Sequence, residues 1–243
     1  MANKMLSVII PCYNEENTIE KLVGRVFNAD RIGLDLEVII IDDGSSDSSA
    51  EKINKMAENH DEIQLNKHPI NRGKGAALRT GFALSKGDIV LVQDADLEYD
   101  PLEYPRLLEP IVNGEADVVF GSRFIGGDSH RVLYFWHYLG NKFITLCSNM
   151  FTNLNLSDVE TCFKVFKGDI IRSIDIQENR FGFEPEITAK LSRLKPMPFI
   201  YEVGVSYFGR TYQDGKKIGW RDGVRALYCI VKYNLIYSRP RSS

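Results

Sequence analysis

Short apolar segments alternate with amphipathic segments along the first half of the chain. The apolar segments have the length of strands and carry few polar residues, as strands that are covered on both faces do. They are Leu6–Ile10, Leu36–Ile41, Ile63–Leu65, Ile89–Gln93 and Asp117–Phe120. Between them, apolar residues recur at helical spacing, and the predicted helices are 19–27, about 49–59 and 76–85. Strands separated by helices predict an α/β fold, with a mostly parallel central sheet and helices on both faces.

The second half has longer helical segments and fewer strands. Helices are predicted at 131–151, 184–194 and 219–237, and strands at 162–166 and 199–207. No linker rich in Pro, Gly or Ser divides the two halves. We therefore expect one domain, 1–243, whose second half completes the site.

Composition narrows the classes of partner. The net charge of −3 gives no overall basis for binding nucleic acid. Four dispersed cysteines and four histidines show no zinc spacing. The N-terminal apolar run is too short for a signal peptide, and no run is long enough to span a bilayer. A cytoplasmic chain is the expectation.

Polar residues follow four of the predicted strands. They are Pro11-Cys12-Tyr13-Asn14-Glu15, Asp42-Asp43-Gly44-Ser45, Asp94-Ala95-Asp96 and Gly121-Ser122-Arg123. In an open parallel sheet, ligands bind beyond the carboxyl ends of the strands. The four segments are therefore expected to meet at one site.

Asp94 and Asp96 indicate a metal site. Two carboxylates one residue apart at the end of a buried strand can both reach one hard divalent cation. Such a cation also binds diphosphate oxygens and neutralises charge on a leaving diphosphate. The alternative is a solvated acidic turn, which a lone Asp-x-Asp often forms.

Two further segments suit a nucleotide. A carboxylate of Asp42 or Asp43 can accept hydrogen bonds from a ribose or a base, although this segment also suits a helix cap. The segment Asn71-Arg72-Gly73-Lys74-Gly75 resembles a phosphate loop at a helix start. It is not a Walker A motif, and a plain turn is the alternative.

Taken in order, these segments resemble those of family-two glycosyltransferases, which have the GT-A fold. The resemblance rests on the strand-end segments above, on Arg72-Gly73-Lys74-Gly75 and on Phe124 after Arg123, and it runs from about Leu6 to Lys217. Within the family, the chain is most similar to polyprenyl-phosphate hexosyltransferases, such as dolichol-phosphate mannose synthase and its glucosyl relatives. The resemblance implies a nucleotide-sugar-binding half at 1–125 and an acceptor-binding half at 126–243.

The resemblance also implies site residues and a cofactor. Asp94, Asp96 and Arg123 would be catalytic, with Mg²⁺ or Mn²⁺ held by Asp94, Asp96 and Glu98. Glu98 stands where the family usually has Gln. The nucleotide would contact Pro11, Tyr13, Glu15, Asp42, Asp43, Lys74, Asp94 and Ala95. The acceptor would contact Arg123, Arg131, Asn141, Arg210, Lys216 and Lys217.

The expected reaction transfers a hexose, with inversion, from a nucleotide-diphosphate sugar of the GDP-mannose or UDP-glucose type to a polyprenyl phosphate. Thr161-Cys162-Phe163 differs from the Ser-Gly-Phe of mannose synthases and leaves the sugar open. A phosphate acceptor is already anionic near neutral pH and needs no strong base. The nearest alternative is transfer to a glycan hydroxyl, with Asp158 or Glu160 as general base. A non-catalytic nucleotide-sugar-binding module is a third hypothesis.

Two later segments bear on the acceptor. The predicted helix around Tyr134, Phe135, Trp136 and Tyr138 combines aromatic and basic residues, as does the final helix. Such composition suits peripheral contact with a membrane interface, and packing in the core is the alternative. The segment 208–217 predicts a lid whose basic residues meet phosphates in the closed site.

Overall fold

The computed structural model describes residues 4–126, 134–209 and 220–236. A seven-stranded sheet runs through the molecule in the order β3-β2-β1-β4-β6-β5-β7. The strands are β1 (Met5–Cys12), β2 (Asp35–Asp42), β3 (Ile63–Lys67), β4 (Ile89–Val92), β5 (Val118–Ser122), β6 (Lys164–Lys167) and β7 (Ile200–Gly204). Only β6 runs antiparallel to its neighbours β4 and β5. The predicted mostly parallel sheet is therefore confirmed.

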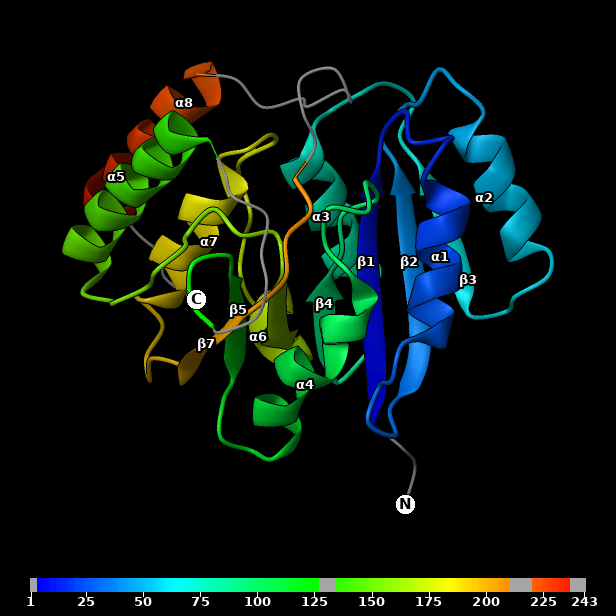
Figure 1. The fold of residues 1–243 in the computed structure, drawn as a ribbon, viewed down its shortest axis with the longest axis horizontal. Helices are drawn as coiled ribbons and strands as arrows, with labels where there is room; N and C mark the ends of the chain where they lie inside the picture. Colours follow the sequence, from blue (N-terminus) through cyan, green and yellow to red (C-terminus); the bar gives the residue numbers. More distant parts are fainter. Residues whose placement is uncertain (1–3, 127–133, 210–219, 237–243) are drawn as a thin grey trace, which may run out of the picture.

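Helices cover both faces of the sheet (Figure 1). The helices are α1 (Ile19–Asn28), α2 (Ser49–Ala57), α3 (Lys74–Leu84), α4 (Tyr104–Val112), α5 (Phe135–Thr152), α6 (Gly168–Arg172), α7 (Phe183–Leu191) and α8 (Trp220–Val231). A 3₁₀ turn, η1 (Pro101–Glu103), precedes α4, and a π-helical turn, η3 (Lys232–Ile236), follows α8. Helices α1 and α4 lie on one face, and α3 and α6 on the other. Phe183 at the start of α7 packs against Phe82 of α3.

The core explains why the strands read as continuous apolar runs. Side chains along β4, most of β1 and the stretch of β2 from Val38 onward are buried because helices cover the sheet from both sides. β1 pairs in register with β2 from Met5–Asp35 to Cys12–Asp42, so the two strands end level with each other. This shared end brings the polar segments after β1 and β2 together.

Two helices lie outside this sandwich. α5 and α8 pack against each other and against α7, at the upper left of Figure 1. Their outer faces leave large apolar side chains exposed, among them Phe135 at 64% and Trp136 at 76%. The alternative that these two aromatic residues pack in the core is therefore wrong. Within the described ranges, none of the helices combines the length and the apolar character needed to cross a bilayer.

Some elements differ from the sequence-based expectation. The segment with η1 and α4 was not predicted, because Pro101, Pro105 and Pro110 break up its helical pattern. Pro105 is nevertheless tolerated in the first turn, where an N–H has no helical partner. α6 is too short to give a periodic signal. The predicted last helix ends earlier, at Val231, and continues as the π-helical turn.

Candidate active site

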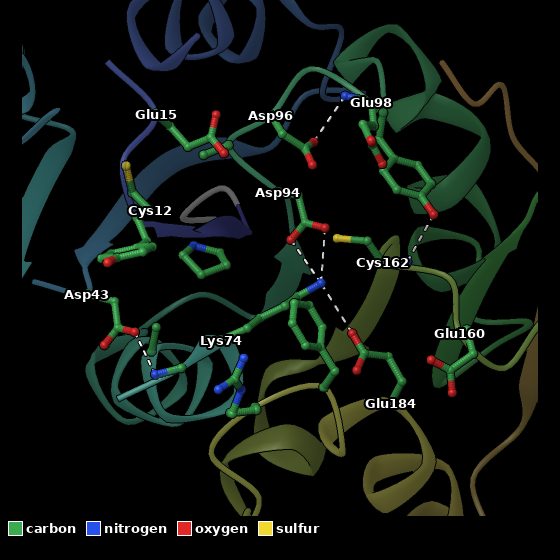
Figure 2. A pocket seen from close by; sticks show the side chains of 18 of the residues that line it. Cys12, Glu15, Asp43, Lys74, Asp94, Asp96, Glu98, Glu160, Cys162 and Glu184 are labelled. Carbon is green, nitrogen blue, oxygen red and sulfur yellow. Dashed lines mark hydrogen bonds and ion pairs between the residues drawn. The ribbon is translucent and has the colours of Figure 1, made fainter. Parts of the chain in front are cut away.

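A cavity of about 440 Å³ opens at the carboxyl edge of the parallel strands (Figure 2). Residues that follow β1, β2, β4 and β5 line it, so the predicted convergence of four strand ends is confirmed. The lining residues are Pro11, Cys12, Tyr13, Glu15, Asp43, Asn71, Gly73, Lys74, Ala77, Asp94, Ala95, Asp96, Glu98, Tyr99, Arg123, Glu160, Cys162, Arg180, Phe181, Glu184 and Tyr207.

The acidic turn after β4 places three carboxylates at this cavity. Asp94 lies 3.0 Å from the Nζ of Lys74. Asp96 accepts a hydrogen bond of 3.1 Å from the backbone N–H of Glu98, and the residue between them, Leu97, has a φ of +63°. This left-handed conformation is costly for a branched side chain and makes the turn tight. Asp94 and Asp96 both line the cavity as a result.

The donor chemistry of this turn fits a hard divalent cation. Asp94 and Asp96 supply carboxylate oxygens, and a cation such as Mg²⁺ or Mn²⁺ takes its other ligands from substrate oxygens and water. Glu98 directs its Oε2 to the hydroxyl of Tyr207, at 2.7 Å. In the part of the chain that the structure describes, no three His, Cys, Asp or Glu residues are grouped so that they could hold a metal. The three-carboxylate set with Glu98 stays a prediction.

Lys74 joins the acidic turn to the opposite wall. Lys74 is the first residue of α3, and its Nζ lies 3.0 Å from Asp94 and 3.2 Å from Glu184 of α7. Burial alone would lower the pKa of Lys74, but the neighbouring anionic groups, Asp94 first, raise it well above its usual value. Lys74 is therefore an ammonium ion inside the cavity. A buried ammonium at a helix start is suited to a diphosphate.

Asp43 and its neighbour Asp42 have different roles. The carboxylate of Asp43 accepts hydrogen bonds from the backbone N–H groups of Arg72 (3.0 Å) and Gly73 (2.6 Å) and contacts His68 at 2.6 Å. Asp43 therefore shapes the loop that precedes α3. A nucleotide that bonds to Asp43 would contact carboxylate oxygens that already accept hydrogen bonds from this loop. Asp42 does not line the cavity. Successive side chains along a strand point to opposite sides, and Asp42 accepts instead from the N–H of Ser45 at 3.2 Å.

Arg123 lines the cavity and is held in place by several contacts. Its Nε and Nη2 each lie 2.7 Å from an oxygen of Asp158, and its guanidinium lies 5.1 Å from the centroid of the Tyr207 ring. Burial raises the pKa of Asp158, but Arg123 outweighs burial and lowers it, so the pair is ionic. Asn141 does not line the cavity; it donates to Asp158 at 3.1 Å. Its position supports a role in orienting the pair rather than direct contact with the acceptor.

The other residues that the sequence assigned to the acceptor lie outside the described residues. They are Arg131, Arg210, Lys216 and Lys217, and the predicted lid lies there except for its first two residues.

Glu160 differs from Asp158, the other residue predicted as a general base. It lines the cavity, and its buried Oε1 has no hydrogen-bond partner in the described ranges. Burial, together with the nearby charge of Glu184, raises the pKa of Glu160 to about 8. Asp158 is fully buried and paired with Arg123. Of the two carboxylates, the geometry favours Glu160 for proton transfer.

Several cavity residues were missed by the sequence analysis. Tyr207 follows β7, which is parallel to β5, so the strand-end rule would have found it if applied to that strand. Arg180 and Phe181 belong to the irregular segment before α7, where no periodic pattern or motif marks them. Their place in the cavity depends on tertiary packing.

Comparisons with known proteins first define the fold. Glucosyl-3-phosphoglycerate synthase from Mycobacterium tuberculosis, solved with Mn²⁺ and UDP-glucose, is similar over 97% of this chain and 80% of that chain, with a TM-score of 0.72 and 21% identity. A second structure of the same enzyme is similar over 97% of this chain and 82% of that chain, with a TM-score of 0.72 and 21% identity. These likenesses establish the fold, and the GT-A expectation is confirmed.

The chain itself belongs to glycosyl transferase family 2, because residues 7–174 match that family. Among its curated relatives are a dolichol-phosphate mannosyltransferase from Pyrococcus furiosus, 29% identical over 94% of this chain, and an undecaprenyl-phosphate 4-deoxy-4-formamido-L-arabinose transferase from Aeromonas hydrophila, 34% identical over 78% of this chain. The matches span only 64% and 57% of these relatives' own lengths.

Proposed function

We propose that the chain catalyses the metal-dependent transfer of a hexose, with inversion, from a nucleotide-diphosphate sugar to a polyprenyl phosphate. One observation carries the proposal. A single cavity contains a paired carboxylate turn, a buried ammonium from Lys74 and a rigid guanidinium from Arg123. A reaction between two phosphate-bearing substrates needs cationic groups at both ends of its site. The names of the two relatives refer to lipid-phosphate substrates, which agrees with this acceptor class.

The nucleotide-sugar occupies the end of the cavity nearest β1 and β2 in this proposal. Pro11, Tyr13 and Glu15 line that end, together with Asp43. Asp94 and Asp96 would hold the Mg²⁺ or Mn²⁺, which supplies charge neutralisation to the leaving diphosphate when bound. Lys74 adds a positive charge from the protein itself.

Arg123 binds the acceptor phosphate. Asp158 holds the Nε–Nη2 edge of the guanidinium, and the Tyr207 ring lies against it, so the arginine loses little freedom when it binds an anion. A phosphate oxygen near neutral pH is already deprotonated, so positioning and charge neutralisation replace a general base. The donor is of the GDP-mannose or UDP-glucose type.

Both halves of the domain contribute to these tasks in this proposal. Residues 1–125 supply the nucleotide and metal residues together with Arg123, and residues 126–243 supply Asp158, which holds Arg123, and the cavity residues Glu160, Arg180 and Tyr207. Because both halves line one cavity, we propose that they act as one catalytic unit.

Lipid access follows from the outer helices. A polyprenyl tail stays in the bilayer while its phosphate lies at the interface, so the catalytic edge must reach a membrane. The exposed apolar faces of α5 and α8 provide a surface for this contact. We propose peripheral binding to the cytoplasmic face, where a water-soluble nucleotide sugar arrives, strengthened by anionic lipid.

Substitution of Arg123 tests the acceptor assignment. Arg123→Ala is expected to lower kcat/KM for polyprenyl phosphate about a hundredfold, while nucleotide-diphosphate affinity changes little. Arg123→Lys keeps one charge without the planar fork and should give an intermediate value. Equal loss of donor binding and acceptor use would make Arg123 a structural residue and remove this support for a phosphate acceptor.

One observation favours a second candidate, transfer to a glycan hydroxyl. Glu160 has a raised pKa and an unpartnered oxygen in the cavity, as a general base requires. A product with the sugar on a glycan hydroxyl, formed while polyprenyl phosphate stays unreacted, would establish this candidate instead. Nucleotide-sugar binding without turnover of either acceptor would indicate a non-catalytic module.

A further inference from the structure

The irregular segment of residues 176–182, which we name the cavity loop, forms one wall of the cavity. Two of its residues, Arg180 and Phe181, line the cavity. On one side, the loop joins the start of α3: the N–H of Ala76 donates to the carbonyl of Asn179 at 3.1 Å, and Nη2 of Arg79 donates to Oδ1 of Asn179 at 3.0 Å. The loop therefore lies directly against the helix that carries Lys74.

Contact between the loop and α3 is close at two glycines. A Cβ on Gly73 would collide with the carbonyl of Asn179, and a Cβ on Gly75 would collide with the carbonyl of Glu178. Both glycines flank Lys74. A shift of the loop would therefore change the surroundings of Lys74 as well as the positions of Arg180 and Phe181.

On its other side, the loop is attached to the C-terminal helices through Glu178. This carboxylate is buried and accepts from Nε and Nη2 of Arg225 at 3.0 and 2.7 Å, from the hydroxyl of Tyr233 at 2.7 Å and from Nζ of Lys232 at 3.1 Å. Burial raises the pKa of Glu178, but these hydrogen bonds outweigh burial and lower it to about 2. Glu178 is therefore ionised at every pH at which the protein would be assayed.

The Glu178 contacts add a polar attachment to the packing of α8 against α5 and α7. The buried apolar residues Cys229 and Tyr233 pack with Ala189 in a small cluster separate from the main core. The opposite face of α8 leaves Val224, Tyr228 and Val231 exposed. Charge-assisted hydrogen bonds to one buried carboxylate are stronger than neutral ones, and they fix its geometry.

We propose that Glu178 is a positioning residue that ties α8 and η3 to the cavity loop and thereby sets the affinity of the cavity for its nucleotide. The clamp consists of Glu178, Arg225, Lys232 and Tyr233. None of these four residues lines the cavity, and the clamp acts through Arg180, Phe181 and Lys74. The identification of the ligand as a nucleotide diphosphate rests on the proposed function, whereas the mechanical link between α8 and the cavity loop does not.

Two measurements on Arg225→Ala test the clamp. Calorimetric titration with UDP and with GDP, each with Mn²⁺, should show binding weakened on the order of tenfold. Hydrogen exchange followed by mass spectrometry should rise in peptides covering the cavity loop and the start of α3, and stay unchanged in β1 and β2. Arg225→Lys, which keeps a charged donor, should recover most of the affinity. Glu178→Gln should reproduce the effect of Arg225→Ala.

A matched control is available on the other side of the molecule. Arg106 pairs with Glu103 and is 53% exposed at its side chain, close to the 50% of Arg225. Arg106→Ala should leave both measurements at the wild-type values. The proposal is wrong if Arg225→Ala also leaves them unchanged, or if exchange rises equally in the central sheet, which would indicate general loosening. If the wild-type protein binds neither nucleotide, the proposed function fails, and the exchange measurement alone decides on the clamp.

Discussion

Titration of Glu160 gives a pH profile whose direction depends on the acceptor. The pKa of Glu160 is raised to about 8. Its protonated fraction therefore falls from about nine-tenths at pH 7 to about one-tenth at pH 9. A neutral carboxyl does not repel an incoming phosphate, whereas an ionised one does. The acceptor phosphate itself has lost its second proton by pH 7, since that pKa is about 6. With a phosphate acceptor, kcat/KM should thus fall up to about tenfold between pH 7 and pH 9.

With a hydroxyl acceptor, the expected change of kcat/KM with pH has the opposite sign. A general base works only when ionised, so kcat/KM should rise over the same interval. The assay measures kcat/KM for polyprenyl phosphate at saturating donor and Mg²⁺, at constant ionic strength. Glu160→Gln is neutral at every pH and should give a flat profile with the phosphate acceptor. A flat wild-type profile, or a fall that persists in Glu160→Gln, would refute this reasoning.

The same carboxyl should affect stability. The folded-state pKa of Glu160 lies above its ordinary value of 4.5. A carboxyl of this kind favours the folded state at low pH, and that contribution is lost as the pH rises from about 4.5 through about 8. Wild-type melting temperature should therefore fall over this interval more than that of Glu160→Gln. Thermal unfolding at pH 5 and pH 8.5, followed by circular dichroism, measures the difference.

Three further predictions concern the metal, the buried ion pair and the membrane. Asp96→Asn should remain folded yet lose at least about a hundredfold in transfer rate, and chelator should abolish wild-type transfer until Mg²⁺ or Mn²⁺ is added back; full activity in excess chelator would contradict the metal role. Asp158→Asn leaves Arg123 without its buried partner and should destabilise the fold by about 3–5 kcal/mol, visible as a melting temperature about 10 °C lower; an unchanged melting temperature would show that solvent or another group neutralises the arginine. Phe135→Ser combined with Trp136→Ser should reduce co-sedimentation with anionic vesicles at low salt while leaving donor hydrolysis intact, because both side chains are exposed; unaltered vesicle binding would place the contact elsewhere.

The first half of the fold could be predicted because local pattern and tertiary structure agree there. β1, β2 and β4 are buried on both faces and therefore appear as apolar runs, and parallel pairing places their polar ends at one edge. The second half of the fold was harder to predict from the sequence. The sequence indicated β6, but the direction of a strand has no sequence signature, and its antiparallel position between β4 and β5 depends on the whole sheet.

The site could be predicted where a residue adjoins a strand end, as Asp94 does. Side-chain pairings could not. Asp42 and Asp43 are adjacent in sequence, yet only Asp43 lines the cavity, because the pleat turns the two side chains apart. The partner of Arg123 lies 35 residues away along the chain. Arg180 lines the cavity from an irregular segment in which the neighbouring Asn179 and Glu178 bond to α3 and α8.

A product assay tests most directly whether this cavity transfers a sugar to a lipid phosphate. The protein is incubated with Mg²⁺, polyprenyl phosphate and each of a panel of radiolabelled nucleotide sugars, and the organic and aqueous phases are then counted separately. We expect label in the organic phase with at least one donor, in a product that mild acid cleaves to the free sugar, and no such label with Asp96→Asn. Label that appears only on a water-soluble glycan, or the absence of label from the lipid with every donor while the nucleotide sugar binds, would contradict transfer to a lipid phosphate.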